Sequence, residues 1–125
     1  MKLVVIVDDN ESVATSLAIA IATIPGVTTT ITHHPSGALR LFEDEENGRT
    51  ISAIVTDFNL PHFDGLELIR QVREIERYRS LPAILITAEE NLAAANGCIL
   101  NTPNAIFRKP FSVREVCRVL EKLLA

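Results

Sequence analysis

The sequence has little of what would indicate a disulfide scaffold, a thiolate metal site or a membrane anchor. Its two cysteines, Cys98 and Cys117, have no CxxC or histidine spacing around them, so we interpret them as small residues of a reducing compartment. No apolar run approaches the ~18 residues that span a bilayer. The N-terminal MKLVVIVDD reaches acid too soon for the core of a signal peptide. We therefore expect a cytoplasmic protein without a membrane segment.

Basic charge is also scarce. The chain has 12 lysines and arginines against 16 aspartates and glutamates, a net charge of −4. A nucleic-acid-binding surface needs clustered Lys and Arg, so we expect no nucleic-acid partner. The 125 residues fit one domain with a full core, and the sequence contains neither repeats nor low-complexity linkers. We expect a single domain over residues 1–125.

Apolar β-rich runs alternate with helical periods along the whole chain. Three runs, KLVVIV, ISAIVT and AILIT, are almost continuously apolar, which is typical of parallel strands covered on both faces. The expected strands are Lys2–Val7, Val27–Thr32, Ile51–Thr56, Ala83–Thr87 and Ala105–Arg108. This alternation predicts a doubly wound α/β sandwich with right-handed crossovers.

Helical stripes fill the intervals between these strands. Their apolar positions are Val13, Leu17, Ala20 and Ile24 before Pro25-Gly26; Leu39 and Phe42 after a start near Ser36; Leu68, Val72 and Ile75; and Val113, Val116, Cys117 and Leu120 after Ser112. Ser112 is a candidate N-cap with Glu115 three residues on. The segment NLAAANGCILNTPN has a central glycine and a Thr-Pro pair, so we expect a short or irregular helix there.

Charged and hydroxyl residues follow the strands, where ligands of such folds bind. Asp8 and Asp9 follow the first strand, Asp57 the third and Lys109 the fifth, while Thr87 ends the fourth. Three carboxylates and one ammonium sum to −2, and like charges ~4 Å apart repel by ~4 kcal/mol near a surface. A divalent cation would balance that charge, and oxygen ligands favour Mg²⁺, with Mn²⁺ as the alternative.

Each of these residues also has a simpler interpretation. One of the two aspartates after the first strand could cap the next helix, with Asn10 as a competitor. Thr87 could close a buried strand and Asp57 could begin a turn. Lys109 could be an ordinary solvated lysine. Their joint occurrence at strand ends favours a common site.

The set of motifs resembles the receiver domain of two-component response regulators. Besides the Asp-Asp pair, DFNLPHFDG at residues 57–65 matches that family's D-x-x-x-P-x-x-D-G, and Thr87-Ala88 and FRKPF at residues 107–111 complete the match. The resemblance covers the whole chain. It implies a flavodoxin-like (βα)5 sandwich whose five parallel strands run in the order 2-1-3-4-5, and a single receiver domain without an output domain in this chain.

The resemblance also implies a reaction. Asp57 would accept a phosphoryl group from a histidine kinase or a His-containing phosphotransfer protein. Asp9, Asp57 and the backbone carbonyl of Asn59 would bind Mg²⁺ directly, and Asp8 would bind it through a water. Such a protein is not an enzyme on external substrates, but it catalyses its own phosphorylation and dephosphorylation.

Other residues would hold the phosphoryl group. Lys109 would contact a phosphoryl oxygen, Thr87 would offer its hydroxyl, and the backbone N–H of Ala88 would be a further donor. The resemblance implies a cis peptide between Lys109 and Pro110.

Asn59 and Glu89 would flank the path of hydrolytic water and tune the lifetime of the acyl phosphate, although both could be solvated loop residues. We expect His62 to be a solvated loop residue as well. The pair His33-His34 ends the second strand, and we expect it on the far side, away from the acids, in a structural or exposed position.

Switching would follow from a movement of Thr87 toward the phosphoryl group, which would repack the fourth strand, the segment after it and the fifth strand. Here the sequence departs from the family, since Ile106 occupies the usual aromatic position and the aromatic residue is Phe107. By strand alternation Phe107 should face the opposite side. Asn104-Ala105 replaces the acidic pair of winged-helix receivers, so we do not expect that dimer face. The output partner is unknown.

Three alternative classes remain. A haloacid-dehalogenase-like phosphatase also uses Asp, Thr, Lys and Mg²⁺, but its nucleophile follows the first strand as D-x-D. A flavodoxin-like cofactor carrier needs a phosphate loop where this chain has DDNE, which would repel phosphate. The third alternative is a receiver-like binding module that is never phosphorylated.

Overall fold

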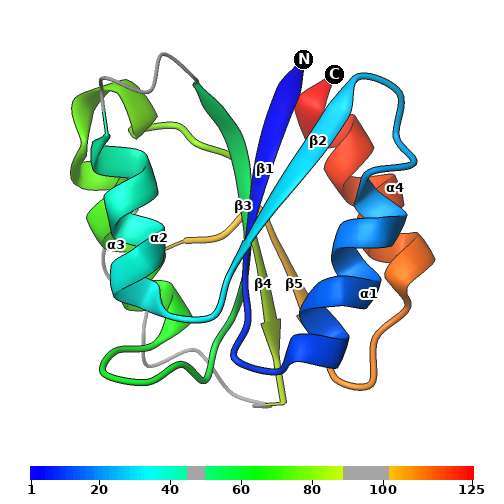
Figure 1. Ribbon diagram of the computed structural model, residues 1–125, viewed down its shortest axis with the longest axis horizontal. Coiled ribbons are helices and arrows are strands. Elements are labelled where there is room, and N and C mark those ends of the chain that lie inside the picture. Colours follow the sequence, from blue (N-terminus) through cyan, green and yellow to red (C-terminus); the bar gives the residue numbers. More distant parts are fainter. Residues whose placement is uncertain (45–49, 89–101) are drawn as a thin grey trace.

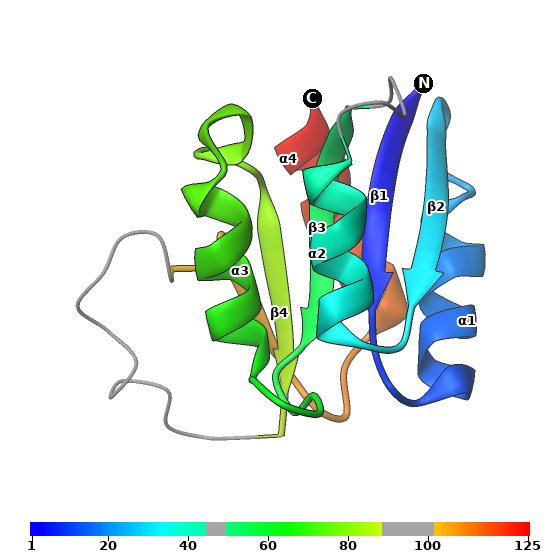
Figure 2. The same cartoon turned by 60° about the vertical axis from the view of Figure 1, so that its left-hand side comes forward.

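The computed structural model describes residues 1–44, 50–88 and 102–125. Its centre is a five-stranded parallel sheet in the order β2-β1-β3-β4-β5, which confirms the predicted fold class (Figures 1 and 2). The strands are β1 (Lys2–Val7), β2 (Val27–Thr32), β3 (Ile51–Asp57), β4 (Ala83–Thr87) and β5 (Ala105–Arg108). Because all strands run the same way, their carboxyl ends share one edge of the sheet.

Helices cover both faces of this sheet. The described helices are α1 (Glu11–Ile21), α2 (Pro35–Glu43), α3 (Gly65–Glu74), the short 3₁₀ helix η1 (Glu76–Tyr78) and α4 (Val113–Leu124). In Figure 1, α2 and α3 lie on one face and α1 and α4 on the other. The irregular helix predicted between β4 and β5 falls mostly on residues 89–101, outside the described residues.

Two apolar clusters, one on each face of the sheet, explain why the strands are continuously apolar. Side chains of β1 alternate between the clusters: Val5 and Val7 pack with residues of α2 and α3, whereas Val4 and Ile6 pack with residues of α1 and α4. All four are fully buried. Burial on both faces is what a central parallel strand requires, so the apolar run of β1 reports its position in the fold.

The helix starts resolve one ambiguity of the sequence. Asn10, rather than Asp8 or Asp9, is the N-cap of α1, and its side chain accepts a hydrogen bond from Val13 N–H at 3.1 Å. Both aspartates are therefore available for another role. The predicted cap of α4 is confirmed, since the Ser112 hydroxyl accepts a hydrogen bond from the Glu115 N–H.

Two predicted helix boundaries shift. Helix α1 ends at Ile21 rather than at Ile24, and the chain then turns through Gly26 at a φ of 78°. Helix α2 begins one residue before Ser36, because Pro35 fits its first turn and the His34 ring acts as the cap.

A buried arginine ties together the starts of β4 and β5. The Arg73 guanidinium donates hydrogen bonds to the Leu81 carbonyl at 2.8 Å and to Asn104 Oδ1 at 3.0 Å. Asn104 Oδ1 also accepts from the Ala83 N–H at 2.8 Å. Burial lowers the pKa of Arg73. Asn104 is itself exposed, and its side-chain oxygen joins Arg73 to the first residue of β4.

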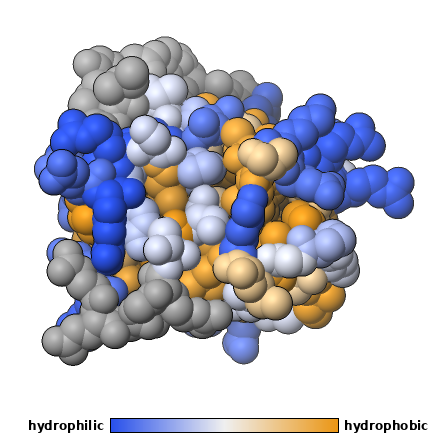
Figure 3. Space-filling view, turned by 90° about the horizontal axis from the view of Figure 1, so that it is seen from above, coloured by the Kyte–Doolittle hydropathy of each residue, from blue (hydrophilic) through white to orange (hydrophobic). Residues whose placement is uncertain are grey.

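The strands begin at the opposite edge of the sheet. Figure 3 looks onto this end, where polar and apolar surface alternate. A hollow of about 470 Å³ lies there among the first residues of β1, the turn before β2 and the end of α4. Within the part of the chain that the structure describes, no helix is long and apolar enough to cross a membrane.

Gly65, the first residue of α3, packs directly against the end of β3. A Cβ at this position would lie 2.3 Å from the Asp57 carbonyl oxygen and 2.9 Å from a Leu85 methyl group. We predict that Gly65→Ala lowers the free energy of unfolding by about 2 kcal/mol, the scale of overpacking, because backbone must move to relieve the clash. Urea unfolding followed by circular dichroism measures this loss.

Gly26→Ala is the matched control. Nothing lies within 4 Å of a Cβ there, but the φ of 78° strains any side chain. It should cost ~1 kcal/mol without disturbing β3. Equal urea midpoints for Gly65→Ala and the wild type would show that the close approach of α3 to β3 is not a constraint.

Candidate functional site

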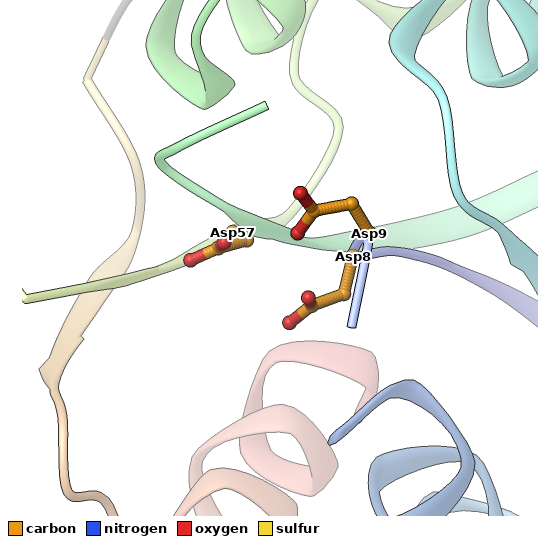
Figure 4. A group of neighbouring side chains, drawn as sticks. All are labelled: Asp8, Asp9 and Asp57. Atoms are coloured by element: carbon orange, nitrogen blue, oxygen red, sulfur yellow. The ribbon is translucent and has the colours of Figure 1, made fainter. Parts of the chain in front are cut away.

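Three aspartates meet at the carboxyl edge of the sheet. Asp8 and Asp9 follow β1 and Asp57 ends β3, and these strands are neighbours with Val7 in register with Thr56. One carboxylate oxygen from each residue lies within 4.8 Å of the others (Figure 4). The structure thus brings together the three acids that the sequence singled out.

Two of these carboxylates are buried and incompletely satisfied. Asp8 is 1% exposed and Asp57 is 4% exposed, whereas Asp9 is exposed. Asp8 Oδ1 accepts a hydrogen bond from the Asn10 N–H at 2.8 Å, but among the described residues Asp8 Oδ2 has no hydrogen-bond partner and Asp57 Oδ1 has only the ion pair with Lys109 at 3.1 Å. Buried polar atoms without partners are rare and costly. Oxygen-only donors in this state fit a hard divalent cation.

Burial and mutual repulsion disfavour the charged forms. Burial raises the pKa of Asp8, and the charges of Asp57 and Asp9 add to the rise, although the Asn10 N–H opposes it. Burial also raises the pKa of Asp57, while Lys109 lowers it and Asp9 raises it. The net direction is upward at both sites, so one lysine does not offset the burial of two carboxylates.

Lys109 is the cation that contacts Asp57. Its Nζ lies 3.1 Å from Asp57 Oδ1, as an ion pair without hydrogen-bond geometry. The Lys109 N–H donates to the Thr87 carbonyl at 2.8 Å, which joins the ends of β4 and β5. The peptide bond between Lys109 and Pro110 is cis.

Thr87 and Ala88 occupy the end of the adjacent strand. Thr87 is the last residue of β4 and is fully buried. Strand β4 pairs with β3, and Asp57 is in register with Ile86, the residue before Thr87. Ala88 follows it and is exposed. Both residues that are predicted to donate hydrogen bonds to the phosphoryl group therefore lie at the same edge as Asp57.

The loop after β3 is held at both ends. The Phe58 N–H donates to the Ile86 carbonyl at 2.8 Å, and the Gly65 N–H donates to the Phe58 carbonyl at 2.8 Å. Asn59 is exposed within this loop, whereas Glu89 lies outside the described residues. His62 adopts a φ of 72°, and the Phe63 N–H donates to the Pro61 carbonyl at 2.9 Å, which makes a tight γ-turn.

The histidines are closer to the acids than the sequence suggested. His34 does have a structural role, since its Nδ1 accepts from the Ser36 N–H at 3.3 Å and caps α2, and its ring centroid lies 4.8 Å from that of His62. His33 is exposed, but it is not remote: its Nδ1 lies 2.8 Å from the Asp8 carbonyl oxygen. The far-side placement was wrong because β2 pairs with β1, so their ends adjoin.

The side chains of β5 alternate as predicted. Phe107 packs against the cluster under α1 and α4, whereas Ile106 points to the other side and is 49% exposed. The aromatic ring of this strand therefore lies on the face opposite to the usual switch position.

Comparison with known proteins agrees with this geometry. The sequence model of the response regulator receiver domain family matches residues 4–121. A chemotaxis protein CheY homolog of Campylobacter jejuni is 31% identical over 74 residues, 59% of this chain and 57% of that protein. The two-component response regulator ORR5 of rice (Oryza sativa) is 29% identical over 87 residues, 70% of this chain and 63% of that protein. These matches span less than two thirds of either relative.

Solved structures share the fold at low sequence identity. Chemotaxis protein CheY4 of Vibrio cholerae superposes with a TM-score of 0.82 at 21% identity, covering 99% of both chains. A putative response regulator from Chloroflexus aurantiacus gives 0.81 at 24% identity, covering 98% of this chain and 97% of that one. Since the family model matches all but the two ends of the sequence, the chain belongs to the response regulator receiver domain family.

Proposed function

We propose that this receiver takes a phosphoryl group onto Asp57 from a phosphohistidine, in the presence of Mg²⁺. The observation that carries the proposal is the state of the Asp57 carboxylate. It is 4% exposed, and within residues 1–44, 50–88 and 102–125 its Oδ1 has no hydrogen bond but lies 3.1 Å from the Lys109 ammonium, beside two further acids. Such a group is a poor structural element and a well-placed nucleophile.

The acid cluster supports a bound divalent cation. Asp9 and Asp57 would hold Mg²⁺ directly, together with the Asn59 backbone carbonyl, and Asp8 would act through a water. When bound, Mg²⁺ supplies positive charge that offsets the carboxylates and the phosphoryl oxygens. Mn²⁺ prefers the same oxygen ligands and is the expected substitute.

The residues of this chain would divide the remaining work. An Asp57 oxygen would form a bond to phosphorus while the bond between phosphorus and the donor nitrogen breaks. Lys109 would stay on a phosphoryl oxygen as a point charge, and Thr87 and the Ala88 N–H would donate hydrogen bonds to the other oxygens. The protein would thus act on itself, and the donor would be a histidine kinase or a His-containing phosphotransfer protein.

The phosphoryl group would change the surface near β5. The acyl phosphate would carry a charge of roughly −2 where the carboxylate carried −1, and a movement of Thr87 toward it would alter the β4–β5 side of the sheet, where Ile106 is exposed. A partner that recognises this side would read the phosphorylation state. The cytoplasmic location stays a prediction.

Phosphorylation by a small donor tests the proposal directly. We predict that acetyl phosphate with Mg²⁺ adds one phosphoryl group to the wild type, stable in acid and labile in base, and that Asp57→Asn adds none, because an amide is not a nucleophile here. Intact mass spectrometry measures the adduct, and Mn²⁺ should replace Mg²⁺.

Asp64→Asn is the matched control. Asp64 lies in the same loop, and its side chain caps α3 by accepting from the Glu67 N–H at 2.8 Å, a role that asparagine also fills. This variant should be labelled like the wild type. Labelling that persists in Asp57→Asn would refute the assignment. No labelling of the wild type by acetyl phosphate or phosphohistidine would favour a binding module.

The acid cluster should also cost stability in the absence of metal. The pKa of Asp8 is raised in the folded state, so protonated Asp8 contributes to the free energy of unfolding at pH values below the ordinary aspartate pKa of 3.8. That contribution is lost as the pH rises through the raised pKa of the folded state. We predict that Asp8→Asn stabilises the metal-free protein at neutral pH by roughly 1 kcal/mol. Urea unfolding at several pH values in EDTA measures the difference.

The same substitution should weaken Mg²⁺ binding, so its stabilising effect should shrink or reverse when Mg²⁺ saturates the wild type. A difference between variant and wild type that stays constant from pH 3 to pH 8 would show that the Asp8 charge does not oppose folding.

A further inference from the structure

Asp8 is fixed by hydrogen bonds at three of its four polar positions. Its N–H donates to the Thr32 carbonyl at 3.2 Å, and its Oδ1 accepts from the Asn10 N–H at 2.8 Å. Its backbone carbonyl lies 2.8 Å from His33 Nδ1. The fourth atom, Oδ2, is buried and has no hydrogen bond to any residue that the structure describes. The only unsatisfied atom of this residue therefore belongs to the acid cluster.

Among these three partners of Asp8, His33 is the one that contacts it through a side chain. A carbonyl oxygen only accepts, so His33 Nδ1 carries the hydrogen and donates it to Asp8. The two residues are 25 positions apart, and His33 itself is exposed at the end of β2. An exposed side chain that reaches a backbone carbonyl beside two acids is placed to orient that backbone.

The carbonyl that His33 holds lies between Asp8 and Asp9. It shares one rigid peptide plane with the Asp9 N–H, so fixing the oxygen fixes the orientation of the plane. Asp9 is exposed and starts the loop to α1, whereas Asp8 is buried, so this plane sets how the two carboxylates diverge. Their repulsion from each other and from Asp57 favours any rotation that separates them.

We propose that His33 is a positioning residue for the divalent-cation site: its hydrogen bond to the Asp8 carbonyl holds the Asp8–Asp9 peptide plane in the orientation that aims both acids at the cation. The inference rests on the proposed function, in that it deepens the Mg²⁺ site described above. Groups that orient ligands typically contribute about tenfold or more to metal affinity. A single hydrogen bond to a backbone carbonyl corresponds to roughly fivefold.

A series of His33 variants tests the position of the donor atom. Asn places its amide N–H near the position of Nδ1, Gln places it farther out, and Ala removes it. We expect His33→Ala and His33→Gln to raise the Mg²⁺ dissociation constant about 5- to 10-fold and His33→Asn to stay within about twofold of the wild type. Amide chemical shifts followed during Mg²⁺ titration give these constants.

Kinetics and stability separate positioning from general damage. With acetyl phosphate, His33→Ala should need more Mg²⁺ for half-maximal labelling but reach the wild-type rate at saturation. Its melting temperature in EDTA should match that of the wild type. His62→Asn is the matched control. His62 lies in the loop after β3 with its ring against that of His34, and asparagine tolerates its positive φ. It should leave Mg²⁺ affinity unchanged.

The outcomes distinguish this inference from the proposed function. If the wild type binds Mg²⁺ and is labelled while His33→Ala binds Mg²⁺ equally well, the positioning role is wrong and the receiver function stands. If Gln restores binding as well as Asn, or if the loss of affinity is matched by a loss of metal-free stability, the role is also wrong. If the wild type binds no Mg²⁺, the proposed function and this inference fall together.

Discussion

Repulsion among three carboxylates at one edge of the sheet is the constraint on which the site depends. Two of them, Asp8 and Asp57, are buried, and the pKa of each is raised, so the metal-free fold has to hold charge that would prefer solvent. Strand β1 makes this tolerable because it is hydrogen-bonded to a strand on each side and packed on both faces. Burial of apolar side chains on both faces of the sheet supplies the folding free energy that offsets the cost of the acid cluster.

The sequence predicted the fold well because its strongest signals are also the most buried elements. The apolar runs of β1, β3 and β4 can be satisfied only between two helical layers, and the acids that follow two of them mark the carboxyl edge. The start of α1 was ambiguous, since Asp8, Asp9 and Asn10 can all cap a helix. Two local hydrogen bonds show which residue is the cap: Asp8 accepts from the Asn10 N–H, and the Asn10 side chain accepts from the Val13 N–H.

The contacts that the sequence did not reveal are those between a side chain and distant backbone. His33 contacts the Asp8 carbonyl and Arg73 contacts the Leu81 carbonyl. Every residue has a backbone carbonyl, so the sequence contains no pattern that marks which carbonyl a side chain will contact. The γ-turn at His62 was also hard to predict, because a histidine is a much weaker signal for positive φ than a glycine. Strand pairing could have given a hint, since β2 beside β1 already places His33 near Asp8.

The two sides of β5 have different freedom, and this bears on how a phosphoryl signal could leave the site. Phe107 packs into the cluster under α1 and α4, and the Lys109 N–H is bonded to the Thr87 carbonyl, so the lysine beside Asp57 is anchored by the core. Ile106 faces the other way and is half exposed. A ring that packs on the side of α1 and α4 does not contact a partner on the opposite face. In this receiver the path from Asp57 to an outside partner would therefore run through Thr87 and the surface around Ile106, rather than through movement of an aromatic side chain.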